Sequence, residues 1–125
     1  MRIFKYKRFS RFAKKENIDD DELRNIVGKL ETGQFDADLG GGVLKMRLAR
    51  PGEGKSGGYR VMVFFRSGER TFFVHGFAKS EIANISKKEL SDLKKLAKTL
   101  FAMTDIQIQV ALKKGMLEEI KEDTQ

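Results

Sequence analysis

The sequence predicts a single α+β domain in which N-terminal helices, an antiparallel sheet of three or four strands and C-terminal helices follow one another. Two segments carry apolar residues at intervals of three and four, as helices do, and the segments between them alternate apolar and charged residues, as strands do. The chain has 125 residues, of which 40% are hydrophobic, and domains typically run to about 100 to 150 residues. We therefore expect one core and one domain over residues 1–125.

The segment before the predicted sheet is mostly helical. A short strand at residues 2–5 should lead into a short helix, and a longer helix should span residues 18–33. Asp19 stands three residues before Glu22 in the arrangement of a capping box, and Gly33 is placed to end this helix. Four apolar residues fall on one face of the longer helix: Leu23, Ile26, Val27 and Leu30.

Apolar residues recur at every second position at residues 44–48 and 59–66, which predicts two strands. A third strand should span residues 70–77. The last two strands are separated by the tight turn at residues 67–69, which favours an antiparallel meander. A second capped helix should begin after Ser86, and a short helix should span residues 104–114. Residues 116–120 should return as a short strand or turn.

Positive charge is concentrated in the predicted sheet. The net charge is +7 and the pI is near 9.7, and excess positive charge attracts polyanions. Lys45 and Arg47 share one face of their strand, and Arg60 interrupts an apolar strand, so we expect these three cations to form one phosphate-binding surface. The opposite, helix-covered face should carry Leu44, Met46, Leu48, Val61 and Val63. A solvated face that only aids solubility is the alternative.

Several chemistries are disfavoured by the sequence. Residues 49–56 satisfy a relaxed Walker A pattern, but they lead into a strand, whereas a phosphate-binding loop of this type must lead into a helix. Asp36 and Asp38 are followed by three glycines, which is typical of a turn. The chain has no cysteine and one histidine. We therefore expect no metal and no cofactor.

The sequence also bears on cellular location. No apolar stretch approaches the roughly 20 residues that span a bilayer, and the first residues lack the apolar region of a signal peptide. We therefore expect a cytoplasmic protein with no membrane partner.

His75, the single histidine, lies among phenylalanines, which favours a satisfied core or edge histidine over a catalytic one.

The run from Asp38 to Arg60 resembles the HigB-type branch of the RelE/ParE toxin superfamily. The similarity continues through residues 73–81, 84–86 and the Glu89-Leu90 pair, and it covers nearly the whole chain. It implies a compact RelE-like toxin of a type II toxin-antitoxin pair. Such a toxin is usually an endoribonuclease that cuts mRNA on the ribosome and is neutralised by a co-expressed helix-turn-helix antitoxin.

The implied reaction uses the neighbouring 2′-hydroxyl of RNA as nucleophile and needs a base, an acid and cations around the phosphate. Arg60 would stabilise the developing charge, Lys45 could act as the base, and Lys79 matches a basic functional position of the family. No tyrosine follows Tyr59, unlike in several RelE-type enzymes, so Tyr59, His75 and Lys79 remain candidates for the acid. The expected RNA contacts are Arg47, Arg50, Lys55, Tyr59 and Arg70.

Two alternatives remain at the level of sequence. The superfamily includes toxins that act on a protein target such as gyrase without cleaving RNA, and a basic RNA-binding module would carry a similar charge pattern. Arrest of translation with cleaved mRNA would distinguish the ribonuclease from both.

Overall fold

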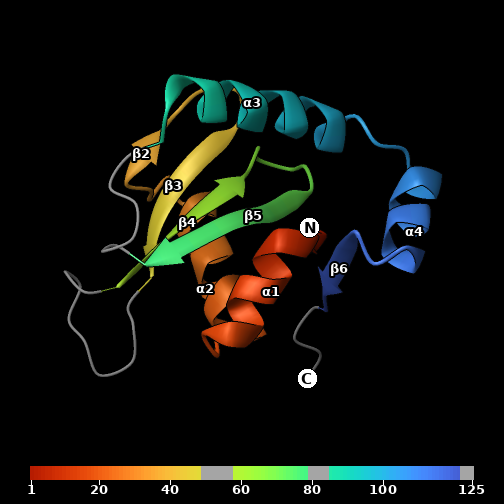
Figure 1. Ribbon diagram of the computed structural model, residues 1–125, viewed down its shortest axis with the longest axis horizontal. Helices are drawn as coiled ribbons and strands as arrows, with labels where there is room; N and C mark the ends of the chain where they lie inside the picture. The colour runs from red at the N-terminus through yellow and green to blue at the C-terminus, as the bar shows by residue number, and fades with distance from the viewer. Residues whose placement is uncertain (49–57, 79–84, 122–125) are drawn as a thin grey trace.

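A six-stranded mixed sheet forms the centre of the protein, with the strand order β2-β3-β4-β5-β1-β6 (Figure 1). The computed structural model describes residues 1–48, 58–78 and 85–121. The strands are β1 (Ile3–Tyr6), β2 (Ala37–Asp38), β3 (Val43–Leu48), β4 (Tyr59–Phe64), β5 (Thr71–Ala78) and β6 (Leu117–Ile120). The helices are α1 (Lys7–Lys15), α2 (Asp20–Glu31), α3 (Lys87–Phe101) and α4 (Asp105–Lys113).

The sheet differs from the predicted one in size and direction. Strands β3, β4 and β5 form the expected antiparallel meander. The prediction of three or four antiparallel strands is wrong, because β1 runs parallel to β5 and β6 runs antiparallel to β1. The order of elements along the chain also differs from helices, then strands, then helices: strand β1 comes before α1, and strand β6 comes after α4. These pairings join the two ends of the chain, which no local pattern can predict.

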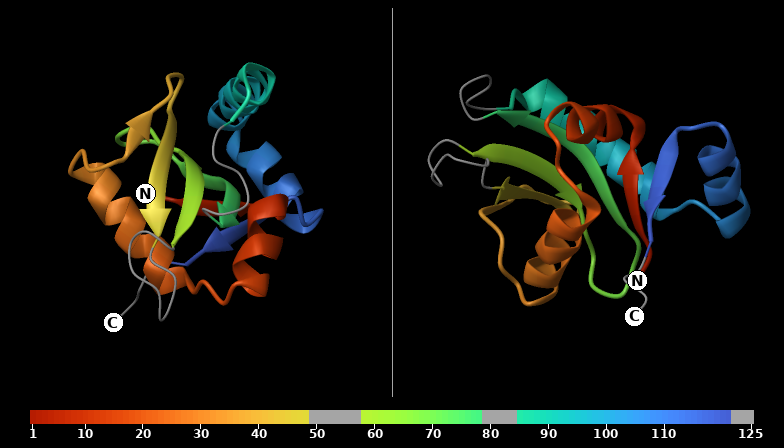
Figure 2. Two further views of the ribbon diagram at one scale, coloured as in Figure 1. Left: turned by 60° about the vertical axis from the view of Figure 1, so that its left-hand side comes forward. Right: turned by 90° about the horizontal axis from the view of Figure 1, so that it is seen from below.

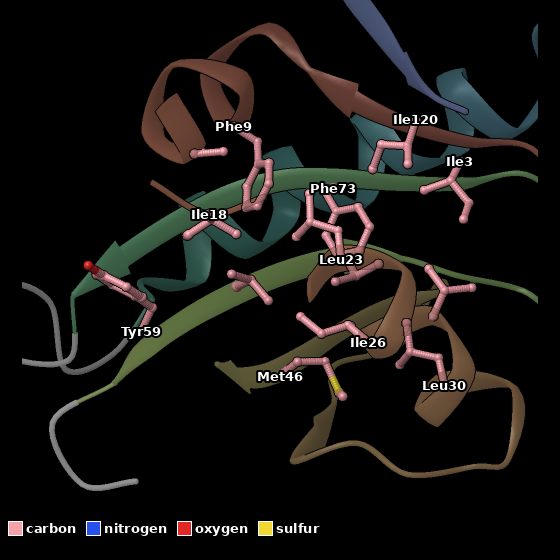
Figure 3. Packing of buried hydrophobic residues seen from close by; sticks show 14 of the residues in the cluster. Ile3, Phe9, Ile18, Leu23, Ile26, Leu30, Met46, Tyr59, Phe73 and Ile120 are labelled. Atoms are coloured by element: carbon pink, nitrogen blue, oxygen red, sulfur yellow. The ribbon is translucent and has the colours of Figure 1, made fainter. Parts of the chain in front are cut away.

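Helices α1 and α2 cover one face of the sheet, below the strands in Figure 1. The cross-strand partners Met46 and Val61 point to this face, and both are buried. Leu23, Ile26 and Leu30 of α2 pack against the strands from below (Figure 3). Burying such a side chain typically contributes about 1.5 to 3 kcal/mol, so this layer provides much of the driving force for folding. The predicted apolar face is confirmed.

Helix α3 lies across the opposite face, as the left view in Figure 2 shows. Leu93, Ala97 and Leu100 of α3 pack on sheet residues that include Met62 and Val74. The expectation that helices cover only one face is therefore wrong. Helix α3 covers the apolar part of this second face, and the charged side chains described below lie on the same face.

Side-chain caps begin the helices where the sequence predicts them. Asp19 accepts a hydrogen bond from the Glu22 backbone N–H at 2.9 Å, and Ser86 accepts one from the Glu89 N–H at 3.1 Å. A complete capping box, with both reciprocal bonds, forms between Thr104 and Gln107 at the start of α4. These caps satisfy backbone donors that the first turn of a helix leaves without a partner.

A buried lysine ties the two ends of the chain together. The Lys5 side chain on β1 is only 10% exposed, and its Nζ lies 3.0 Å from Asp20 Oδ1 and 3.8 Å from Glu118 Oε1. Ser10 donates a hydrogen bond to Glu118 Oε2 at 2.5 Å, and this bond is the main reason that the pKa of Glu118 is lowered. Removing one partner of such a cluster is costly, because it leaves the buried charge uncompensated.

Among the described residues, no helix combines the length and the apolar character needed to cross a membrane.

Gly76 of β5 allows α1 to approach the sheet closely. A Cβ atom at this position would overlap the Phe12 ring of α1. We expect Gly76→Ala to lower the free energy of unfolding by about 1 to 3 kcal/mol, the usual range for an overpacked site, in urea denaturation. The matched control is Gly28→Ala, because Gly28 is an exposed position in α2 where an added Cβ would meet no atom within 4 Å. It should stabilise the protein by about 0.5 to 1 kcal/mol; equal effects of the two variants would contradict this packing.

Candidate nucleic-acid interface

Three predicted cations lie on one face of the sheet. Arg47 of β3 is the direct cross-strand partner of Arg60 of β4, so their side chains leave the same face about 5 Å apart at Cβ. Lys45 is two positions before Arg47 and therefore shares this face. Lys45 pairs with Met62, which in turn pairs with His75 of β5. We call Lys45, Arg47, Arg60 and His75 the basic face.

A β-bulge in β5 brings His75 to the basic face. Val63 pairs with Phe73 and Met62 pairs with His75, so Val74 is an extra residue without a partner in the ladder. Strict alternation would place His75 on the same side as Phe73, which is buried against α1 and α2. The bulge turns His75 to the side of Arg60 instead, and bulges beside functional sites commonly redirect a side chain in this way.

Arg60 has an unsatisfied donor. Its side chain is half-buried, and its Nη1 atom is buried without a hydrogen-bond partner among the described residues. Leaving a buried donor unpaired is costly, and like charges directly opposite each other in a sheet are destabilising. An anion bound between Arg60 and Arg47 would relieve both costs. A phosphate group suits this position, because guanidinium groups bind phosphate oxygens with two parallel hydrogen bonds.

His75 is in a position to exchange a proton. Its Nδ1 atom is also buried with no hydrogen-bond partner in the described part of the chain, which does not fit the expected satisfied histidine. Its ring packs against Phe77 at a centroid distance of 5.5 Å. Burial lowers the pKa of His75, the positive charge of Arg8 lowers it further, and Glu89 opposes these effects. The imidazole is therefore neutral near pH 7 and can accept a proton.

Two predicted RNA contacts lie elsewhere. Tyr59 is only 2% exposed and points to the opposite face, where its hydroxyl donates to Glu16 Oε2 at 2.7 Å (Figure 3). The adjacent positions 59 and 60 alternate between faces, so Tyr59 cannot lie beside Arg60. Arg70 stands directly before the first residue of β5, at the end of this strand that lies away from Arg60. There it donates to the Met103 carbonyl at 2.5 Å and to Asp105 Oδ1 at 2.6 Å. Tyr59 thus links β4 to Glu16, and Arg70 links the start of β5 to the segment before α4 and to Asp105.

Arg50, Lys55 and Lys79 lie outside the described residues. Asp38 has the turn role that the sequence favours, because its Oδ1 accepts a hydrogen bond from the Gly40 N–H at 2.9 Å. Asp36 has a different environment, since its Oδ1 lies 3.8 Å from Arg47 Nε. Within residues 1–48, 58–78 and 85–121, no cluster of three or more His, Cys, Asp or Glu side chains could hold a metal ion.

Sequence reasoning missed two charged residues near His75. Arg8 lies in α1 and Glu89 lies in the first turn of α3, and both act on His75 electrostatically. A signal for Glu89 does exist, since it stands four residues before Leu93 and therefore continues the stripe of α3 that faces the sheet. Arg8 has no comparable signal, because its position relative to β5 depends on how α1 packs against the sheet.

A small α+β domain with a basic sheet face is the class of protein that these observations define. The chain matches, over residues 1–120, the family described as RelE toxin of the RelE / RelB toxin-antitoxin system. The protein therefore belongs to the RelE toxin family, and membership implies an antitoxin partner. No curated protein matches the chain.

The lowered pKa of His75 predicts a pH-dependent stability. Between the folded pKa and the usual value of 6.5, the unfolded chain binds the proton more readily, so stability should fall as the pH falls through this window. We expect urea denaturation to show a loss of stability from about pH 7.5 to about pH 5.5 in the wild type and a smaller loss in His75→Gln. The pKa values of Glu118 and Glu119 are lowered from 4.5, so these groups titrate below this range. Parallel pH profiles for the two proteins would contradict the buried position of His75.

Proposed function

We propose that this protein is a HigB-type toxin that cleaves mRNA on the ribosome by a metal-independent mechanism. The observation that carries the proposal is the direct pairing of Arg47 with Arg60, whose Nη1 atom has no hydrogen-bond partner among the described residues. Two guanidinium groups on one open face fit the phosphodiester of RNA. Membership of the RelE toxin family supports the toxin role, and the run from Asp38 to Arg60 supports the HigB branch.

The arrangement of the basic face suits a reaction in which the 2′-hydroxyl attacks the adjacent phosphorus. Neutral His75 would accept the proton of this hydroxyl, and Arg60 would stabilise the charge on the non-bridging oxygens. The bond to the 5′-oxygen breaks, and this oxygen takes up a proton. The products are a 2′,3′-cyclic phosphate and a free 5′-hydroxyl, so water is not consumed in this step.

With His75 as the base, Lys45 would donate that proton, which reverses the role of base that the sequence suggested for Lys45. Lys45, Met62 and His75 form one row across three neighbouring strands, so the backbones of Lys45 and His75 lie about 10 Å apart. Met62 itself is fully buried, so the phosphate would lie beside this row, at the neighbouring Arg47–Arg60 pair. The side chains of Lys45 and His75 would approach it there from the two outer strands, as a base and an acid must. Lys79 is a second candidate by its resemblance to a basic functional position of the family.

Arg60→Ala tests the role of the guanidinium. We expect the variant to lose about 100-fold to 1000-fold in the rate of mRNA cleavage, the usual cost of removing one transition-state donor. Primer extension on mRNA in a reconstituted translation system measures this rate. A thermal melt must show that the variant is folded, since a half-buried arginine can also affect stability.

The matched control is Arg70→Ala, which also removes one arginine charge but does so next to the first residue of β5, away from Arg60. This variant should lose stability together with its bond to Asp105, and it should keep the cleavage rate of the wild type. Treating the purified toxin with EDTA, and removing the chelator before the toxin is added to the translation system, should leave the wild-type rate unchanged. Folded Arg60→Ala that cleaves at the normal rate would contradict the mechanism, and arrested growth with intact mRNA and DNA damage would favour a gyrase-type toxin.

The antitoxin should bind the basic face with acidic segments, because complementary charge both accelerates association and blocks the phosphate site. We expect the association rate of the complex to fall as salt is raised from about 0.1 M to about 1 M, since the Debye length shortens from about 10 Å to about 3 Å. Stopped-flow mixing with the helix-turn-helix antitoxin measures this rate. A rate that is independent of salt would place the antitoxin on another surface.

A further inference from the structure

An open hollow of about 500 Å³ lies beside the basic face, where the chain leaves α2 and runs toward β2. Its size is within the range of small-molecule sites. It is lined by Lys29, Gly33, Gln34, Phe35, Asp36, Met46 and Arg47. The pairing of β2 with β3 ends at Lys45, so the hollow follows the unpaired edge of β3 within the described part of the sheet.

Arg47 connects this hollow to the basic face. It lines the hollow, and it is also the cross-strand partner of Arg60. Its side chain is 57% exposed and its Nε lies 3.8 Å from Asp36 Oδ1, so it is held only loosely and can reach a phosphate. A nucleotide whose phosphate lies on the basic face would therefore have its base near the hollow.

Phe35 provides an apolar surface in the hollow. Its side chain is 43% exposed, but the backbone of both neighbouring residues is hydrogen-bonded. The Gln34 N–H donates to the Lys29 carbonyl at 2.9 Å, and the Asp36 N–H donates to the Lys45 carbonyl at 2.9 Å. The backbone on both sides of Phe35 is thus hydrogen-bonded before any ligand arrives. An exposed ring on a fixed backbone is suited to stacking against a base.

The polar groups of the hollow favour one base over the others. Gln34 Nε2 is used in a hydrogen bond to Thr32 Oγ1 at 2.8 Å, which leaves its carbonyl oxygen as an acceptor. The Asp36 carboxylate is a second acceptor, and Lys29 and Arg47 are donors. Guanine presents two N–H groups beside a carbonyl oxygen on its Watson–Crick edge, and a carboxylate can accept from both N–H groups. Adenine and cytosine present only one amino group there.

We propose that this hollow is a nucleobase subsite that stacks a guanine on Phe35 and recognises it through Asp36. This proposal rests on the proposed function, because it names the base that would lie next to an RNA phosphate bound on the basic face. Toxin cleavage would then show a preference for guanine at one position that flanks the cut.

The test measures binding with oligonucleotides that cannot be cleaved. The probes are fluorescein-labelled 2′-O-methyl hexauridylates that carry one guanine or one adenine, which lack the attacking hydroxyl, and the readout is fluorescence anisotropy with the full chain. The wild type should bind the guanine probe more tightly than the adenine probe. Phe35→Ala should weaken binding of both by roughly 5-fold to 100-fold, the effect of losing one base stack.

Asp36→Asn separates recognition from charge. Loss of the carboxylate should strengthen binding of all RNA, so the decisive quantity is the ratio of the two affinities. Because an asparagine amide pairs with adenine through one donor and one acceptor, this ratio should shift toward adenine. Ile106→Ala is the matched control for Phe35→Ala, since Ile106 is 75% exposed on α4, and it should bind both probes like the wild type.

The outcomes distinguish this subsite from the proposed function. Equal affinity of the wild type for the two probes, or unchanged binding by folded Phe35→Ala, would overturn the subsite even if mRNA is cleaved. A preference for guanine that is lost in Asp36→Asn would establish the subsite even if the wild type leaves mRNA intact, because the probes report binding alone.

Discussion

The pairing of Arg47 with Arg60 is the interaction on which the rest of the candidate site depends. Two like charges on neighbouring strands cost stability, and the protein maintains them because the opposite sides of β3 and β4 are anchored by Met46 and Val61 in the core. The hydrophobic layer thus fixes a register that the charges alone would disfavour. A one-residue slip of either strand would move its arginine toward that core, so burial of the apolar face also fixes the position of the basic face.

The site combines elements from distant parts of the chain. Strands β3 and β4 carry the arginines, the bulge in β5 turns His75 toward them, and Arg8 of α1 and Glu89 of α3 set its charge environment from two sides. In the proposed reaction, phosphate binding, proton transfer and base recognition would take place on neighbouring parts of the molecule. Arg47 belongs to both the phosphate position and the proposed base subsite, which makes it the residue through which these two parts of the substrate would be aligned.

Local patterns predicted the helices, the strands other than β2, and which side chains of β3 and β4 share a face. They could do so because alternation and capping depend on residues close in sequence. They could not predict that β1 runs parallel to β5, since this pairing depends on contacts about 70 residues apart along the chain. The bulge at Val74 likewise appears only when β4 is present to define the ladder. Tyr59 is a different case: residues 59 and 60 of one strand alternate between faces, so the sequence itself already indicates that Tyr59 cannot contact RNA beside Arg60.

The pairing of β1 with β6 affects how the chain can fold while it is being translated. Strand β1 emerges first from the ribosome, but its neighbours β5 and β6 are made much later, and the Lys5 cluster needs Glu118. Strand β1 has no partner until β5 has been made, and its second partner, β6, follows only after α3 and α4. Non-local pairing of this kind is intrinsically slow. The sheet can therefore be completed only at the end of the protein's own translation.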